Sequence, residues 1–193
     1  MNLIDFVKNP QWDLWRNFIN DISETDDHLK DNYLNIDFNE FLSFPCVLDS
    51  EKIVCFSGLQ YNEKKWGPGV ARCSSRMWVH PEYRIQGISK FEGGNKFLNT
   101  TYCLPLQFEC AKKLGIDTLF ISRESNPMAF KKYIDLVKIN CGIDFVVQDK
   151  KYNVCGPGHS LQPTCQQYVA VHCANMDAKS TWIKNMTRPH MIL

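Results

Sequence analysis

The sequence lacks the features that would place it in a membrane or on nucleic acid. No hydrophobic run approaches the roughly 18 residues of a membrane-spanning helix, and the N-terminal residues have no basic lead typical of a secretory signal. Its 22 basic and 21 acidic residues leave a net charge of +1, without the basic excess of a nucleic-acid binder. We therefore expect no membrane association, and the composition does not favour a nucleic-acid partner.

The cysteines also lack the patterns of a disulfide framework or a metal site. There are nine, an odd number, and no Cys-x-x-Cys pair occurs. We expect reduced thiols in a cytoplasmic protein, with Cys55, Cys73 and Cys173 packed in core strands as small hydrophobic residues. A zinc site near the C-terminus would match no standard spacing, so we expect no metal. Its candidate ligands are His159, Cys165, His172 and Cys173.

The pattern of apolar residues predicts a mixed α/β domain. Apolar residues at helical spacing predict a helix over 11–22 whose aromatic side chains face the core. Asp26 or Asp27 is a candidate cap for a second helix that runs to about Leu34, and 39–44 could add a turn. Two later helices are expected over 104–114, ended by Gly115, and over 126–139. The expected strands are 46–48, 53–61, 70–79, 118–121, 143–147 and 167–172.

A turn of distinctive composition runs from Val79 to Ser89, between a strand-like run and a helical one. Its sequence is Val-His-Pro-Glu-Tyr-Arg-Ile-Gln-Gly-Ile-Ser. Gly87 lets the backbone approach phosphate oxygens, while consecutive N–H groups and a helix start favour negative charge. The segment therefore indicates a pyrophosphate-binding loop to which Arg84 adds charge; a plain turn at a strand end is the alternative.

This segment resembles a signature of the GNAT superfamily, the acyl-coenzyme A-dependent N-acetyltransferases. In that family a Val-x-Pro-x-x-Arg run leads into a Gln/Arg-x-x-Gly-x-Gly/Ala loop. A second resemblance begins at Asn126, with Ala129 three residues on and Tyr133 seven residues on. The resemblance implies one GNAT-like domain, a central, mostly antiparallel sheet flanked by helices. It would comprise N-terminal helices (1–44), an acyl-CoA-binding core (45–150) and C-terminal strands (151–193).

The resemblance also implies an activity and a site. An acetyl group would pass from acetyl-CoA to a small-molecule or peptide amine by direct attack in a ternary complex. Tyr133 would be the catalytic acid that protonates the leaving thiolate, since a phenol is protonated at neutral pH. A homodimer is common among similar proteins, and the acceptor would meet 24–44 and 152–166. The implied cofactor-binding residues are Met77, Trp78, Val79, Arg84, Ile85, Gln86, Gly87, Ile88, Ser89 and Asn126.

Other features leave alternatives open. Gly93-Gly94 should interrupt the helix after the loop, and Pro105 should not sit deep inside a helix. Arg76-Met77-Trp78 resembles a segment of phage Mom-type DNA-modification enzymes, in which Arg72, Arg76 and Trp78 on one strand face could bind a base. A non-catalytic coenzyme A-binding module is a further alternative. The general base is unassigned among His80, Glu82, Glu124 and His172.

Overall fold

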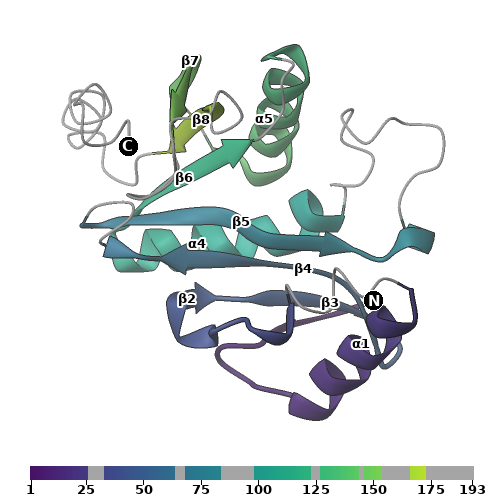
Figure 1. Cartoon of the computed structure of the whole chain (residues 1–193). Helices are drawn as coiled ribbons and strands as arrows, with labels where there is room; N and C mark the ends of the chain where they lie inside the picture. Colours follow the sequence, from purple (N-terminus) through teal and green to yellow (C-terminus); the bar gives the residue numbers. More distant parts are fainter. Residues whose placement is uncertain are drawn as a thin grey trace.

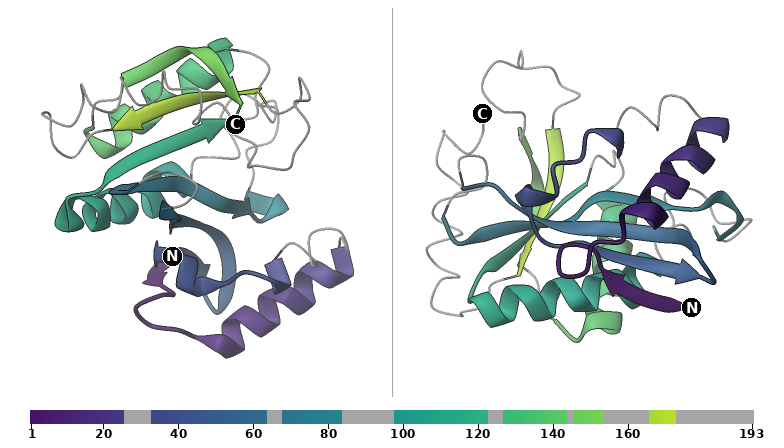
Figure 2. Two further views of the ribbon diagram at one scale, coloured as in Figure 1. Left: turned by 60° about the vertical axis from the view of Figure 1, so that its left-hand side comes forward. Right: turned by 90° about the horizontal axis from the view of Figure 1, so that it is seen from below.

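An eight-stranded mixed sheet forms the centre of the part of the chain that the computed structural model describes (Figures 1 and 2). That part comprises residues 1–25, 33–63, 68–83, 98–122, 127–143, 146–153 and 166–172. The strand order is β1-β3-β4-β5-β6-β8-β7, and β2 also pairs with β4. In chain order the elements are β1 (Asn2–Asp5), α1 (Trp12–Thr25), η1 (Phe38–Glu40), β2 (Phe41–Ser43), β3 (Pro45–Asp49), β4 (Lys52–Tyr61), β5 (Val70–Val79), η2 (Pro81–Tyr83), η4 (Asn99–Cys103), α4 (Leu104–Leu114), β6 (Asp117–Ser122), α5 (Pro127–Cys141), β7 (Val146–Asn153) and β8 (Gln166–His172).

Most of the predicted elements are confirmed. Helices α1, α4 and α5, the β3–β4 hairpin, and strands β5, β6 and β8 lie where the pattern places them. Gly115 ends α4 in the left-handed conformation, with φ 64°. Strand β7 begins at Val146 rather than 143. The description of residues 1–44 as helices is wrong in part, because β1 and β2 lie there; four and three residues are too few to show strand periodicity.

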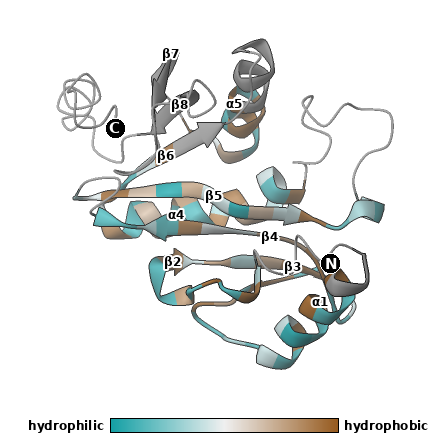
Figure 3. Cartoon of the chain, viewed as in Figure 1, coloured by the Kyte–Doolittle hydropathy of each residue, from teal (hydrophilic) through white to brown (hydrophobic). Residues whose placement is uncertain are grey.

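One face of the sheet carries α1 and a cluster of aromatic side chains. Trp15 and Phe18 of α1 pack edge-on against Phe56 of β4, with ring centroids 5.3 and 5.1 Å away. Figure 3 shows the hydrophobic side of α1 turned toward the strands. Trp12, predicted in the core with them, is 53% exposed. It stands at the first residue of the helix and touches the edge of the cluster through the Phe6 ring, 5.0 Å away.

The opposite face is covered by α4 and α5. Leu104, Phe108 and Ala111 of α4 join Ile134 and Val137 of α5 in a second buried cluster. Thus residues from 104–137 cover one face, while the N-terminal helix covers the other face over β3, β4 and the end of β5.

The helical backbone enters α4 through a π-helical turn, η4. The Leu104 N–H bonds to the Asn99 carbonyl, five residues back. Pro105 follows in the first turn of α4 and has no N–H to donate. The Thr100 carbonyl instead accepts a hydrogen bond from Cys141 Sγ at 3.7 Å. Pro105 therefore lies in the first turn of α4 and not deep inside that helix, as expected, while the π-helical turn before it was not expected.

The expectation of core thiols is confirmed for Cys55 and Cys73, while Cys173 lies outside the described residues. Burial raises the pKa of the Cys46 and Cys73 thiols far above the ordinary value. The pKa of Cys55 is raised by its hydrogen bond with Cys103 and then by burial. These three side chains are therefore neutral thiols in the folded protein.

Stability should consequently fall at high pH. Above about pH 9 the unfolded chain loses thiol protons that the folded chain keeps, so each of these three thiols contributes a slope of about −1.4 kcal/mol per pH unit to the free energy of unfolding. Urea unfolding from pH 8 to pH 10.5 measures this slope. Cys73→Ala should remove one thiol's share of it, and an unchanged slope in that variant would contradict the assignment.

Candidate functional site

The sheet opens between β5 and β6. These two strands are parallel and pair through only three residues each, Val70–Arg72 with Asp117–Leu119. Beyond that point they diverge, as Figure 1 shows. Since the strands are parallel, the segments that follow both of them leave at the same edge of the sheet. The gap between two diverging parallel strands, at their carboxyl ends, is a common place for ligands in α/β proteins.

Two bulges bend β5 at the point where it leaves β6. Along β4 the residues opposite β5 advance by two, from Phe56 to Gly58 to Gln60, while their partners on β5 advance by three, from Trp78 to Ser75 to Arg72. Each interval thus contains one extra residue on β5. Ser74 (φ 53°) and Arg76 (φ 56°) have left-handed conformations that non-glycine residues rarely adopt. Such bulges bend and twist a strand and are frequent beside active sites.

The bulges also overturn the expectation that Arg72, Arg76 and Trp78 share one face. Phe56, Gly58 and Gln60 are two residues apart along β4, so they point to one face of the sheet. Their partners on β5, Trp78, Ser75 and Arg72, therefore share that face. Arg76 falls between them and is exposed. Trp78 is 6% exposed and stacks on Phe56 at 5.8 Å between ring centroids. The indole therefore offers no open face on which a nucleic-acid base could stack.

The carboxyl end of β5 continues as an ordered ladder. The His80 N–H bonds to the Val54 carbonyl at 2.8 Å. Because backbone groups alternate in direction along an antiparallel ladder, those of Val79 point away from β4, toward the side from which β6 has separated. The side chain of Val79 lies buried among Val47, Val54 and Leu98.

A short turn, η2, connects β5 to the predicted phosphate loop. The Tyr83 N–H bonds to the His80 carbonyl at 2.9 Å, and the Tyr83 hydroxyl donates to the Asp49 carboxylate of the β3–β4 hairpin. The Asp49 hydrogen bond raises the pKa of Tyr83. Tyr83 immediately precedes Arg84, so these bonds hold the point at which the predicted loop begins.

Solved structures of known proteins share this architecture. A scan against protein-family models and a search of curated proteins gave no match. Among solved structures, a probable acetyltransferase from Staphylococcus epidermidis ATCC 12228 gives a TM-score of 0.53 at 11% identity, over 90% of this chain and 99% of that one. Aminoglycoside 6'-acetyltransferase type Ii gives 0.51 at 14% identity, over 91% and 98%. The chain has the GNAT fold.

The predicted fold class is therefore confirmed. The GNAT fold here has a mixed sheet in which β5–β6 is parallel and the other described strand pairs are antiparallel. A further match with this fold is a GNAT family acetyltransferase from Elizabethkingia anophelis with acetyl-CoA bound, at a TM-score of 0.45 and 12% identity, over 89% of this chain and 97% of that one.

Within this GNAT fold, the structure describes only some of the predicted site residues. Met77, Trp78 and Val79 lie on β5 beside the opening. Tyr133 lies on α5, although its side chain is outside the described residues. The other predicted site residues lie outside the described part of the chain and stay predictions. They are Arg84, Ile85, Gln86, Gly87, Ile88, Ser89 and Asn126.

The structure describes the side chains of two of the four candidate general bases, His80 and Glu82. His80 Nδ1 accepts the Glu82 N–H at 3.3 Å, so that nitrogen serves the turn. The Glu82 side chain is 83% exposed. Glu124 and the His172 side chain lie outside the described residues.

Where the structure describes side chains, no three His, Cys, Asp or Glu residues are grouped to hold a metal. Among the described helices, none is long and apolar enough to cross a membrane. The four candidate zinc ligands lie outside that part.

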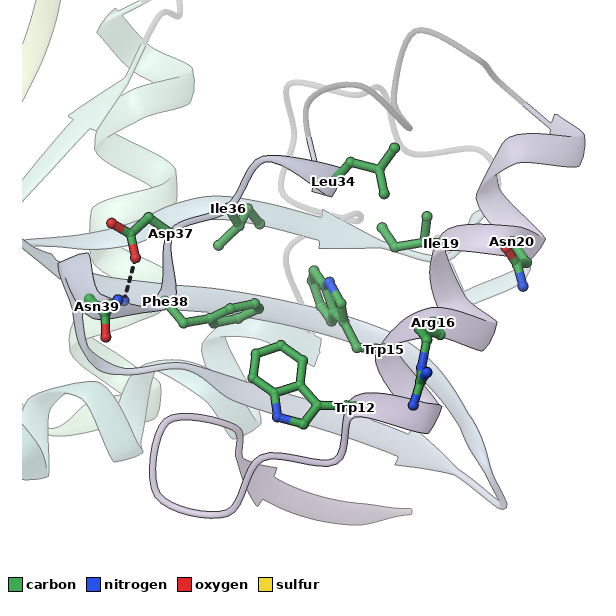
Figure 4. Close-up of a pocket in the computed structure, with 10 residues that line it drawn as sticks. All are labelled: Trp12, Trp15, Arg16, Ile19, Asn20, Leu34, Ile36, Asp37, Phe38 and Asn39. Carbon is green, nitrogen blue, oxygen red and sulfur yellow. Dashed lines mark hydrogen bonds between the residues drawn. The ribbon is translucent and has the colours of Figure 1, made fainter.

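A separate pocket of about 520 Å³ lies between α1 and residues 34–39 (Figure 4). Trp12, Trp15 and Phe38 lie together on one side of it, with Arg16 near its rim. The buried contacts of Trp15 with Phe56, and of Phe56 with Trp78, lie between this pocket and β5. The pocket is thus on the α1 side of the GNAT fold, in part of the region that was expected to meet the acceptor.

Removing the Tyr83 hydroxyl should loosen the turn before the predicted loop. We expect Tyr83→Phe to lower the melting temperature by roughly 2–4 °C at pH 7. Because the pKa of Tyr83 is raised in the folded state, the difference should disappear as the pH rises above 10 through that raised pKa. Thermal unfolding of both proteins across pH 7–11 measures it. Tyr102→Phe, in the same cluster, is the control, and equal effects of the two substitutions would refute the role of Asp49.

Proposed function

We propose that this chain is a GNAT-type acetyltransferase that binds acetyl-CoA in the opening between β5 and β6. The observation that carries the proposal is the short parallel pairing of these strands, with the predicted pyrophosphate loop following β5 and η2 along the chain. A cofactor laid into this opening would meet the loop at one end and the bulged strand along its length. The GNAT fold, together with the resemblance of the loop to that family's signature, supports the same ligand.

The predicted loop would supply most of the affinity. The pyrophosphate carries negative charge, so consecutive backbone N–H groups over 84–89 and the Arg84 guanidinium would attract it. Gly87 would allow the closest approach because it has no Cβ. Asn126 precedes the first residue of α5, where its amide would contact the coenzyme or cap the helix.

The reaction would proceed by direct attack within a ternary complex. The amine nitrogen attacks the thioester carbonyl carbon, a C–N bond forms and the C–S bond breaks. Tyr133 would give its proton to the departing thiolate, while the proton of the amine passes to a base or water that is unassigned. Backbone N–H groups of the Met77–Val79 edge would stabilise the carbonyl oxygen as it gains charge. Binding both substrates together supplies the orientation.

The two other functions predicted from the sequence have less support. A Mom-type DNA-modifying enzyme required Arg76 and Trp78 to act together, and the bulge at Arg76 and the burial of Trp78 separate them. A non-catalytic binding module would bind acetyl-CoA without turnover. The acceptor class remains an amine, small molecule or peptide, and residues 24–44 and 152–166 are the segments proposed to meet it.

Calorimetric titration of acetyl-CoA tests the cofactor and its loop. We expect saturable binding by the wild type and an affinity at least about tenfold lower for Gly87→Asp, because a carboxylate there would repel the pyrophosphate. Gly115→Asp is the control for an added carboxylate, since Gly115 is exposed and no atom lies within 4 Å of the point where a Cβ would stand. Because its left-handed φ of 64° makes that substitution strained, the melting temperatures of both variants are measured beside their affinities. Absence of binding by the wild type, or equal binding by Gly87→Asp, would overturn the placement.

Release of coenzyme A in the presence of a panel of amines tests the chemistry. For any amine that the wild type acetylates, Tyr133→Phe should lower kcat by about 10²-fold, the usual contribution of a general acid. The dissociation constant of acetyl-CoA should be unchanged, because the phenol acts only on the leaving group. An unchanged kcat would remove Tyr133 from the reaction, and binding without turnover of any amine would favour the binding module.

A further inference from the structure

A closed ring of hydrogen bonds, buried or partly buried, holds the first bulge of β5. Gln107 Nε2 donates to Ser57 Oγ at 2.7 Å, and Ser57 Oγ donates to Asn99 Oδ1. Asn99 Nδ2 then donates to Ser74 Oγ at 2.8 Å, and the Ser74 N–H returns to Gln107 Oε1 at 3.0 Å. We call Ser57, Asn99 and Gln107 the polar ring. All three side chains are fully buried, with no exposed surface.

The π-helical turn η4 places two members of this ring in line. Asn99 and Gln107 are eight residues apart, which in a regular α-helix would leave their side chains about 80° apart around the axis. The π turn Asn99–Cys103 takes up one extra residue. The pair is therefore spaced like residues i and i+7 of an α-helix, only about 20° apart. Both amides thus reach the same strands, β4 and the bulge of β5.

The ring compensates for a conformation that the sheet cannot hold by itself. A left-handed conformation is unfavourable for a non-glycine residue, and the bulge takes Ser74 out of the regular pairing of β4 with β5. Gln107 supplies the acceptor for the Ser74 N–H, while its Nε2 also donates to the Ser57 carbonyl at 3.1 Å. Side chains from the helix therefore fix the backbone of the bulge from outside the ladder.

We propose that the polar ring positions the bulge of β5, and through it the backbone at Met77–Val79, for acyl transfer. The proposal rests on the proposed function, since it assigns these residues a role in that reaction. The ring residues are buried and do not touch substrate, so they are positioning residues. A bulge that shifts by a fraction of an ångström would misplace the N–H groups proposed to bind the carbonyl oxygen, and we expect it to leave pyrophosphate binding unchanged.

The test compares two buried serines. Ser57→Ala breaks the ring, whereas Ser43→Ala removes a hydroxyl that is equally buried and donates to Asp5 at 2.8 Å, away from β5. We expect Ser57→Ala to lower kcat by about tenfold or more, with the acetyl-CoA dissociation constant within about twofold of the wild-type value. Ser43→Ala should keep the wild-type kcat, although its melting temperature should fall about as much as that of Ser57→Ala.

Hydrogen exchange measured by mass spectrometry provides a readout that does not depend on activity. Amides of 74–77 should exchange at least about tenfold faster in Ser57→Ala and in a second variant, Asn99→Ala, but not in Ser43→Ala. Unchanged exchange in both ring variants would overturn the proposal. Faster exchange with an unchanged kcat would overturn the catalytic role alone. If the wild type neither binds nor uses acetyl-CoA, the proposed function fails, and the exchange result still decides whether the ring holds the bulge.

Discussion

The structure depends on one constraint, the inability of β5 to stay paired along its whole length with both of its neighbours. Two extra residues let β5 keep pairing with β4 through Val79, yet its contact with β6 ends at Arg72. The bend that results opens the sheet, leads the chain into η2, and leaves a gap that the helices α4 and α5 border. A regular β5 would have closed this gap with ladder hydrogen bonds, and the proposed acetyl-CoA site would not exist.

The aromatic face is built around the same bend. Gly58 stands opposite Ser75, between the two bulges, and a Cβ there would come within 2.2 Å of the Phe41 ring and 2.8 Å of the Phe44 ring. Phe41 and Phe44 thus fill the space that a side chain would need. Packing on this face and bending on β5 are therefore linked, since the same short stretch of β4 must accept both the rings and the displaced register.

Much of the fold could be predicted from the sequence because its main elements carry clear patterns. Trp15, Phe18 and Ile22 mark one side of a helix, and the stretch from Val70 to Val79 stands out as a strand between a loop with Gly and Pro and the turn that follows it. The bulges could not be predicted, because Ser74 and Arg76 are not the glycines that usually signal a left-handed conformation. The π turn before Pro105 could not be predicted either, because its Thr100 carbonyl finds its donor, Cys141, on another helix. The candidate loop rests on its motif, since 84–89 lie outside the described residues.

The three residue pairs between β5 and β6 have a mechanical consequence. Strands β1 to β5 lie on one side of these pairs and β6 to β8 on the other. The sheet therefore consists of two parts that are joined by a short stretch of pairing. Where the structure describes the chain, the packing of α4 against α5 provides a second connection between the two parts. A ligand bound in the opening would contact both parts at once. It would limit their motion relative to one another beside this short stretch of pairing.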